Sequence, residues 1–188
     1  MIAIIDYGMG NLRSLNYKLE KENIKSIITN DHIEIKKSDK LILPGVGNFK
    51  KAMDNLKDLK LIDLLNDEIL EKRKPIFGIC LGMQLMTTYS EEGNSNGLNW
   101  IDAETTKFVF HENENKVPNV GWMKINVLKH HTFLSRLEEI EYYFTHSYNV
   151  KCNNESDVIA QSHYGIDFDS VIAKDNIFGT QFHPEKSH

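Results

Sequence analysis

The stretch Ile76-Phe77-Gly78-Ile79-Cys80-Leu81-Gly82-Met83-Gln84 decides the fold of this chain. Its apolar start at residues 76–79 predicts a buried strand, and the apolar segment that follows it predicts a helix. Glycines at 78 and 82 suit a sharp strand-to-helix turn, where side chains would crowd the backbone. The stretch therefore predicts a nucleophile elbow with Cys80 at its tip, where hydrolases often carry serine.

On the N-terminal side of this elbow, strand and helix signals alternate. The leucine spacing predicts a helix from Leu12 to about Glu22, and residues 50–74 predict another helix in two pieces, ended by Pro75. Strands are predicted at residues 2–5, 24–28 and 41–43. This alternation is typical of an α/β fold in which a central, mainly parallel sheet is flanked by helices on both faces.

The C-terminal half carries strand signals without intervening helices. Asp175-Asn176 predicts a tight turn between two of these strands, and the polar segments 91–99 and 112–116 predict loops. Strands are predicted at residues 106–110, 124–127, 142–145, 158–161, 171–173 and 177–181. We therefore expect additional antiparallel strands beside the parallel sheet, within a single domain that spans residues 1–188.

Composition excludes several classes of protein. A chain of 188 residues can bury a core without disulfides or metals, and a formal net charge of −5 argues against a nucleic-acid partner. No apolar stretch has the length of a membrane-spanning helix, and the N-terminus lacks the basic leader of a signal peptide. We expect a cytoplasmic protein with reduced cysteines, no membrane association, no metal site and no cofactor.

Cys80 is the candidate nucleophile. The elbow places its sulfur at the carboxyl edge of the sheet, where α/β folds bind ligands, and a helix N-terminus favours the reactive thiolate. An isolated cysteine is more often a buried structural residue, which is the interpretation for Cys152 beside Lys151 and Asn153. The glycine-flanked turn favours a catalytic role for Cys80.

A cysteine nucleophile needs a base and a group that orients the base. In the string from Gly179 to Lys186, His183 follows the predicted strand 177–181, so it should lie just past the same edge of the sheet. Glu185 can turn back toward the imidazole if Pro184 bends the chain. His-Pro-Glu alone would equally suit an exposed turn, but beside the elbow it predicts a triad with Cys80.

A third string, from Leu43 to Phe49, contains two glycines directly after a predicted strand. Backbone N–H groups at Val46 and Gly47 could point into a cleft and hold an oxyanion. An ordinary strand-to-helix turn would explain the same residues. A phosphate-binding loop is disfavoured, because the Lys-Ser/Thr ending of that motif is missing.

Taken in order, these strings resemble the class I (triad) glutamine amidotransferases, whose fold is flavodoxin-like. Six strings are more narrowly similar to the glutaminase subunits of imidazole glycerol phosphate synthase, and the match runs from Met1 to Ser187. They cover residues 5–14, 44–49, 78–84, 117–122, 143–148 and 180–187. The resemblance implies that the chain hydrolyses L-glutamine to glutamate and ammonia.

The resemblance also implies a role for each part of the site. Cys80 attacks the carboxamide, His183 protonates the departing ammonia and then activates water, and Glu185 orients the imidazole. The oxyanion is held by backbone N–H groups of Leu81, Val46 and Gly47. The α-amino and α-carboxylate end of glutamine is contacted by Gln84 and Glu92. Without the resemblance, these two would be interpreted as a surface helix residue and a solvated loop acid.

The family resemblance further implies a heterodimer with a (β/α)8-barrel cyclase subunit, which receives the ammonia through a channel in histidine biosynthesis. The residues expected at that interface are Lys186, Asn11, Pro118 and Trp122. Activation by the liganded partner is expected, and the glycine-rich segment 44–47 is our hypothesis for the switch.

Two departures from the family pattern keep other interpretations open. Asn119 stands where histidine is usual and Met123 where asparagine is common, and both are expected on the docking surface. One alternative is a paralogous glutaminase that supplies ammonia to a sugar amidotransferase in surface- or flagellin-glycan biosynthesis. Lower-ranked alternatives are a non-catalytic regulatory subunit of the same fold and a cysteine hydrolase or peptidase. A C-terminal helix, usual in the family after Ser187, is expected to be missing.

Overall fold

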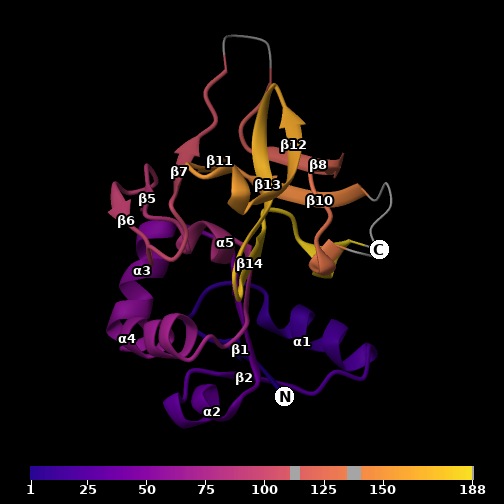
Figure 1. The fold of residues 1–188 in the computed structure, drawn as a ribbon. Coiled ribbons are helices and arrows are strands. Elements are labelled where there is room, and N and C mark those ends of the chain that lie inside the picture. Colours follow the sequence, from indigo (N-terminus) through magenta and orange to yellow (C-terminus); the bar gives the residue numbers. More distant parts are fainter. Residues whose placement is uncertain (111–114, 135–140, 188) are drawn as a thin grey trace.

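The computed structural model describes residues 1–110, 115–134 and 141–187. Its lower half in Figure 1 is an α/β arrangement built on five parallel strands in the order β2–β1–β3–β4–β14. These strands are β1 (Ile2–Ile5), β2 (Ser26–Thr29), β3 (Lys40–Gly45), β4 (Ile76–Cys80) and β14 (Ile177–Thr180). The last strand of the chain thus lies beside the strand that carries Cys80, with Thr180 opposite Ile79.

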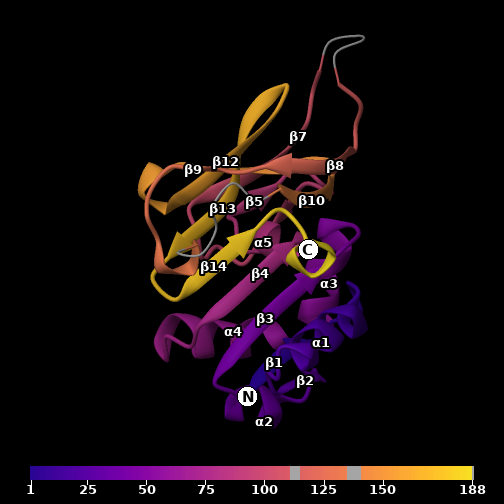
Figure 2. The ribbon, with the colours of Figure 1, turned by 90° about the vertical axis from the view of Figure 1, so that its right-hand side faces the viewer.

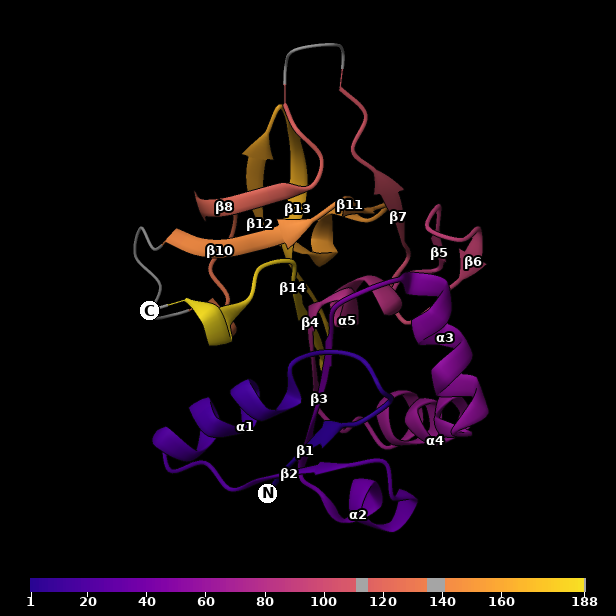
Figure 3. The same ribbon diagram turned by 180° about the vertical axis from the view of Figure 1, so that it is seen from behind.

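Helices cover both faces of these strands (Figure 3). Helix α1 (Leu12–Lys21) lies on one face, and α3 (Phe49–Asp58), α4 (Leu61–Asn66) and α5 (Leu81–Leu85) lie on the other. Successive side chains of β1 alternate between the two: Ile4 packs with Leu15 of α1, whereas Ala3 and Ile5 join the core beneath α3 to α5. Within the described ranges, no helix is long and apolar enough to cross a membrane.

The sheet continues beyond β14 in antiparallel strands, as predicted for the C-terminal half. They are β13 (Ile166–Lys174), β11 (Tyr148–Cys152), β12 (Val158–Tyr164) and β7 (Ala103–Lys107). Three short strands lie at the margins: β9 (Asn126–Val127), β5 (Tyr89–Ser90), which pairs with β7 in parallel, and β6 (Ser95–Asn96). A separate antiparallel pair is formed by β8 (Asn119–Lys124) and β10 (Glu141–His146). The helical turn η4 (Pro184–Lys186) lies between α1 and β10 (Figure 2).

The sequence placed most elements correctly, with differences where elements are short. Strand β7 begins three residues before the predicted 106–110, and the predicted 124–127 falls across β8 and β9. The predicted loop 91–99 contains β6, and β11 was not predicted. Such short or partly polar strands carry little period-two signal. The predicted loop 112–116 lies largely outside the described residues.

Two helical segments also differ from the prediction. Helix α2 (His32–Lys37) was not predicted, because six residues hold too little periodicity; its start is set by Asp31, whose carboxylate accepts hydrogen bonds from N of Ile33 and Glu34. The helical stretch 50–74 has three parts, since α4 continues into a π-helical turn, η1 (Asp67–Glu71).

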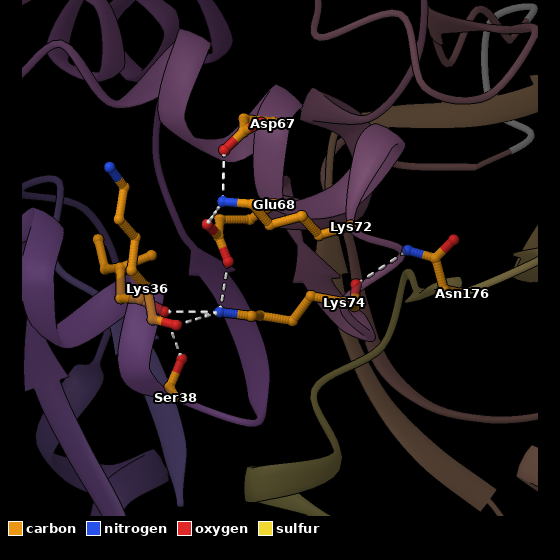
Figure 4. A network of polar contacts seen from close by, with 8 residues as sticks. Lys36, Ser38, Asp67, Glu68, Lys72, Lys74 and Asn176 are labelled. Atoms are coloured by element: carbon orange, nitrogen blue, oxygen red, sulfur yellow. Dashed lines mark hydrogen bonds and ion pairs between the residues drawn. The ribbon is translucent and has the colours of Figure 1, made fainter.

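A buried ion network joins this π-helical turn to the start of β4 (Figure 4). Glu68 is 1% exposed, and its carboxylate oxygens lie 2.7 Å from Nζ of Lys72 and 2.5 Å from Nζ of Lys74. Burial acts to raise the pKa of Glu68, but the two lysines outweigh it and lower the pKa. Lys74 also donates to the carbonyl oxygens of Ile35 and Lys36, both at 2.9 Å. The network therefore holds the N-terminal end of β4 in place, and Cys80 lies at the other end of this strand.

Candidate active site

Cys80 lies at the junction of β4 and α5 with φ +53° and ψ −108°, a conformation that neither a strand nor a helix adopts. Crowding explains the glycines on either side. A Cβ on Gly82 would overlap the carbonyl oxygen of Leu43, and one on Gly78 would lie 2.7 Å from Cε of Met86. The predicted strand-turn-helix is confirmed, and close packing of the backbone is what holds Cys80 in its unusual conformation.

His183 and Glu185 lie beside this junction because the C-terminal segment pairs with β10. The backbone N of His183 donates to the carbonyl oxygen of Tyr143 at 2.9 Å, and Oγ of Ser187 donates to the carbonyl oxygen of His183 at 2.9 Å. Pro184 then starts the turn η4, which brings Oε1 of Glu185 to 2.8 Å from Nδ1 of His183. The predicted pairing of imidazole and carboxylate is present, and both side chains are buried.

The surroundings of His183 favour its protonated form. Burial by itself would lower its pKa, but hydrogen bonding and charge from Cys80 and Glu185 outweigh burial and raise the pKa to about 9. Nδ1 is engaged by Glu185, and Nε2 has no hydrogen bond of good geometry to the described residues. Nε2 is therefore the nitrogen available for proton exchange with the Cys80 thiol.

Cys80 opens onto a cavity of about 250 Å³. This volume is slightly below the range typical of sites for drug-sized ligands and suits a small metabolite. Besides Cys80, six residues predicted for the site or interface line it: Val46, Gly47, Leu81, Gln84, Glu92 and Pro118. The stretch from Thr145 to Tyr148, between β10 and β11, forms a further part of the wall. The tertiary structure thus brings segments from four distant parts of the chain to the candidate nucleophile.

Gln84 and Glu92 are held at this cavity by specific hydrogen bonds. Nε2 of Gln84 donates to the carbonyl oxygen of Tyr148 and to Oε1 of Gln181, both at 3.1 Å. Oε2 of Glu92 accepts from the backbone N of Phe49, at the start of α3, at 2.8 Å. Gln84 is buried rather than a surface residue, so its location agrees with the expected substrate contact.

The candidate oxyanion segment, residues 44–47, is anchored to the sheet through its first two residues. Strand pairing with β4 extends through Gly45, opposite Cys80, and Oη of Tyr7 donates to the carbonyl oxygen of Pro44 at 2.6 Å. Val46 and Gly47 lie beyond this pairing and are exposed, with Gly47 at φ +117°. The part of segment 44–47 that can rotate its amide groups is therefore confined to residues 46–47.

Asn119 was expected on the docking surface, and this prediction is wrong. Alternate residues of β8 face inward, so Asn119 is 1% exposed and Met123 packs against the core of the C-terminal half. Nδ2 of Asn119 lies 3.0 Å from Nε2 of His146, whose Nδ1 lies 2.7 Å from the carbonyl oxygen of Tyr148. Burial lowers the pKa of His146 to about 4; the hydrogen bond to Tyr148 opposes this effect and the charge of His183 adds to it.

The expected interface residues lie around the triad. Trp122 on β8 and Tyr143 on β10 are paired, with ring centroids 6.0 Å apart, and Nζ of Lys186 lies 5.5 Å from the centroid of the Tyr143 ring. Asn11 caps α1 by accepting from the backbone N of Ser14 at 3.4 Å, and it lines a small cavity beside His183 and Glu185. We refer to Trp122, Tyr143 and Lys186 as the aromatic patch.

The sequence interpretation missed Gln181. Its side chain is fully buried, and Nε2 lies 3.6 Å from Sγ of Cys80. The available signal was its spacing: Gln181 comes two residues before His183 at the end of a predicted strand. Extended residues two apart point to the same side, so both side chains should reach Cys80.

The fold and the site define a class I glutamine amidotransferase. Residues 3–188 match the family model described as glutamine amidotransferase class-I, and the chain belongs to this family. Among curated relatives, Imidazole glycerol phosphate synthase subunit HisH 2 of Methanococcus maripaludis is 47% identical, with 100% of this chain and 93% of the relative covered. The HisH subunit of Leptospira interrogans is 41% identical, with 100% and 94% covered.

Solved structures agree on the fold. A glutamine amidotransferase matches with a TM-score of 0.77 at 16% identity and covers 98% of this chain and 91% of its own. A putative GMP synthase protein from Thermoplasma acidophilum matches with a TM-score of 0.71 at 24% identity, covering 100% and 85%. At these identities, the likeness concerns the fold alone.

Proposed function

We propose that this chain is the glutaminase subunit of an imidazole glycerol phosphate synthase, which hydrolyses L-glutamine and passes ammonia to a cyclase subunit in histidine biosynthesis. The observation that carries this proposal is that Cys80, at its strained elbow and open to the cavity, interacts with His183 of the buried His183–Glu185 pair. The similarity to HisH subunits over the whole chain supports the same assignment.

In the proposed reaction, the Cys80 thiolate, whose proton is held on Nε2 of His183, attacks the side-chain carbonyl carbon of glutamine. The C–N bond breaks as His183 returns that proton to the departing ammonia, which leaves a glutamyl thioester. His183 then takes a proton from water, whose oxygen attacks the thioester and releases glutamate. Glu185 stabilises the imidazolium in both halves, and backbone N–H groups of Leu81 and of residues 46–47 hold the oxyanion.

We propose that Gln84 and Glu92 both recognise the α-ammonium group of glutamine. Both hydrogens of the Gln84 amide are engaged, so the group it can offer a ligand is its oxygen, Oε1. Glu92 is an acceptor when ionised, and the backbone N of Phe49 occupies only one of its oxygens. Oxygen acceptors suit an ammonium and would repel an α-carboxylate, which refines the expectation from sequence.

For the partner, we propose that a (β/α)8-barrel cyclase subunit docks on the aromatic patch and forms a heterodimer with this chain. Trp122 is on the outward face of β8, and Pro118, just before this strand, lines the cavity together with Thr145 of β10. Because Asn119 and Met123 face inward, their departure from the family pattern leaves this surface unchanged. We infer a reducing compartment, the cytoplasm, because the reaction needs a free Cys80 thiol.

The test is a glutaminase assay of the chain with a liganded cyclase partner. Cys80→Ser should lower the rate by more than about 10³-fold, and the matched variant Cys152→Ser should retain the rate, since Cys152 lies outside the cavity. Full activity in Cys80→Ser would overturn the proposed chemistry. Complex formation and ammonia transfer with a sugar amidotransferase, but not with the cyclase, would instead assign the paralogous pathway. Equal rates with and without liganded cyclase would contradict activation by the partner.

A further inference from the structure

A buried chain of hydrogen bonds connects the inner face of β8 with the site of the nucleophile. Asn119 meets His146 at 3.0 Å, and Nδ1 of His146 meets the carbonyl oxygen of Tyr148 at 2.7 Å. Nε2 of Gln84 reaches the same carbonyl oxygen at 3.1 Å. Two side chains from different elements thus share the single acceptor that Tyr148 provides.

Gln181 completes this chain and ends it at the sulfur of Cys80. Its Oε1 accepts from Nε2 of Gln84 at 3.1 Å, and its Nε2 lies 3.6 Å from Sγ of Cys80, within hydrogen-bond range for sulfur. Its backbone N donates to the carbonyl oxygen of Ser170 on β13 at 2.9 Å. Gln181 is therefore held in place by hydrogen bonds from both its backbone and its side chain.

Donor and acceptor roles in this chain follow from the chemistry of its members. The carbonyl oxygen of Tyr148 can only accept, so Gln84 must present its NH₂ group there, and the same group faces Gln181. Gln181 must then offer its oxygen to Gln84, which turns its NH₂ group toward Cys80. The orientation of the Gln181 amide is thus fixed without reference to the sulfur.

We propose that Gln181 is a positioning residue for the glutaminase reaction, one that holds the Cys80 sulfur and the Gln84 amide in a fixed relation. An N–H donor directed at the sulfur favours the thiolate over the thiol, because a hydrogen bond to the charged form stabilises that form. The oxygen of the same amide holds Gln84, which we place at the substrate α-ammonium. The contact between Gln84 and the substrate rests on the proposed function, whereas the effect of Gln181 on the Cys80 thiol does not.

The first test measures alkylation of Cys80 by iodoacetamide across a range of pH, in a Cys152→Ser background. Gln181→Leu removes the donor, so the inflection of the rate should move up by about one pH unit and the rate at pH values below the inflection should fall about tenfold. The matched control is Asn149→Leu, which removes another buried amide, one that donates to the carbonyl oxygen of Thr106. That control should leave the alkylation profile unchanged.

Gln181→Glu provides a second variant of nearly the same shape if Gln181→Leu does not fold. It places a carboxylate oxygen against the sulfur, so the inflection should move up further than one pH unit. A wild-type alkylation profile in either folded variant would overturn the proposal and leave Gln181 as a packing residue. Because alkylation requires no glutamine, a shifted profile in a chain without glutaminase activity would refute the proposed function while supporting this inference.

Discussion

Nδ1 of His183 lies 2.8 Å from Oε1 of Glu185, and the two side chains are 2% and 7% exposed. Among the described residues, none donates to Oε2 of Glu185. The carboxylate therefore acts mainly on the imidazole. Cys80 and Glu185 together raise the pKa of His183, although burial of the ring acts to lower it.

Glu185→Gln should lower the pKa of His183 from about 9, because the amide cannot stabilise the imidazolium as a carboxylate does. Glutaminase activity should fall by about 10²-fold to 10⁴-fold. NMR titration of the His183 ring and the glutaminase assay measure the two effects. Asp167→Asn is the matched control, since Asp167 pairs with His163 on the surface. An unchanged His183 titration in Glu185→Gln would contradict this account.

The raised pKa of His183 predicts that the protein loses stability at alkaline pH. The pKa of His183 is about 9 in the folded chain, against an ordinary value of 6.5, so the folded state holds its proton more tightly. This contribution is complete below pH 6.5 and is lost as the pH rises through about 9. Urea unfolding should show the free energy of unfolding decreasing across that window, and Glu185→Gln should flatten the decrease. An equally steep decrease in the variant would assign it to other groups.

The lowered pKa of His146 predicts that the protein also loses stability at acidic pH. Its pKa is about 4 in the folded chain, against an ordinary value of 6.5, so between these values the unfolded state binds more protons. The free energy of unfolding should therefore fall by up to about 3 kcal/mol as the pH drops from 6.5 to 4. His146→Asn should remove that part of the slope in urea unfolding, whereas His163→Asn, on the exposed part of β12, should retain it. The same slope in all three proteins would contradict the prediction.

Gly82→Ala should destabilise the chain by more than about 3 kcal/mol, because the added Cβ would overlap the carbonyl oxygen of Leu43. Relief requires β3 and α5 to separate, and this movement would displace Cys80. Thermal unfolding and the yield of folded protein measure the effect. A folded variant with wild-type stability would mean that the elbow tolerates a side chain at this position.

Lys74→Met should cost about 2–4 kcal/mol of stability, because it removes one of the two lysines that neutralise the buried Glu68 carboxylate. The matched control is Arg73→Met, whose partner Asp175 is exposed and whose ion pair should contribute less than about 1 kcal/mol. Urea unfolding near pH 7 compares the two variants. The double variant Glu68→Leu with Lys74→Met should recover much of the loss. Similar costs for Lys74→Met and Arg73→Met would contradict a buried ion network.

The sequence by itself determined the α/β class, the elbow and the candidate triad. Continuous apolar runs such as Ile2–Ile5 indicate strands buried on both faces, and glycines 78 and 82 mark a turn that tolerates no side chain. His183 and Glu185 are close in sequence, so a local turn is enough to pair them. These features are encoded within short stretches of chain, and short stretches can be interpreted without knowing what packs on them.

Only the tertiary structure decided which side chains surround Cys80. Gln181 reaches the sulfur because β14 lies beside β4, a pairing of strands about a hundred residues apart. Asn119 faces His146 rather than a partner because of the register of β8 against β10, and a shift of one residue would reverse its direction. Contacts between distant segments depend on sheet order and register, which local residue patterns do not specify.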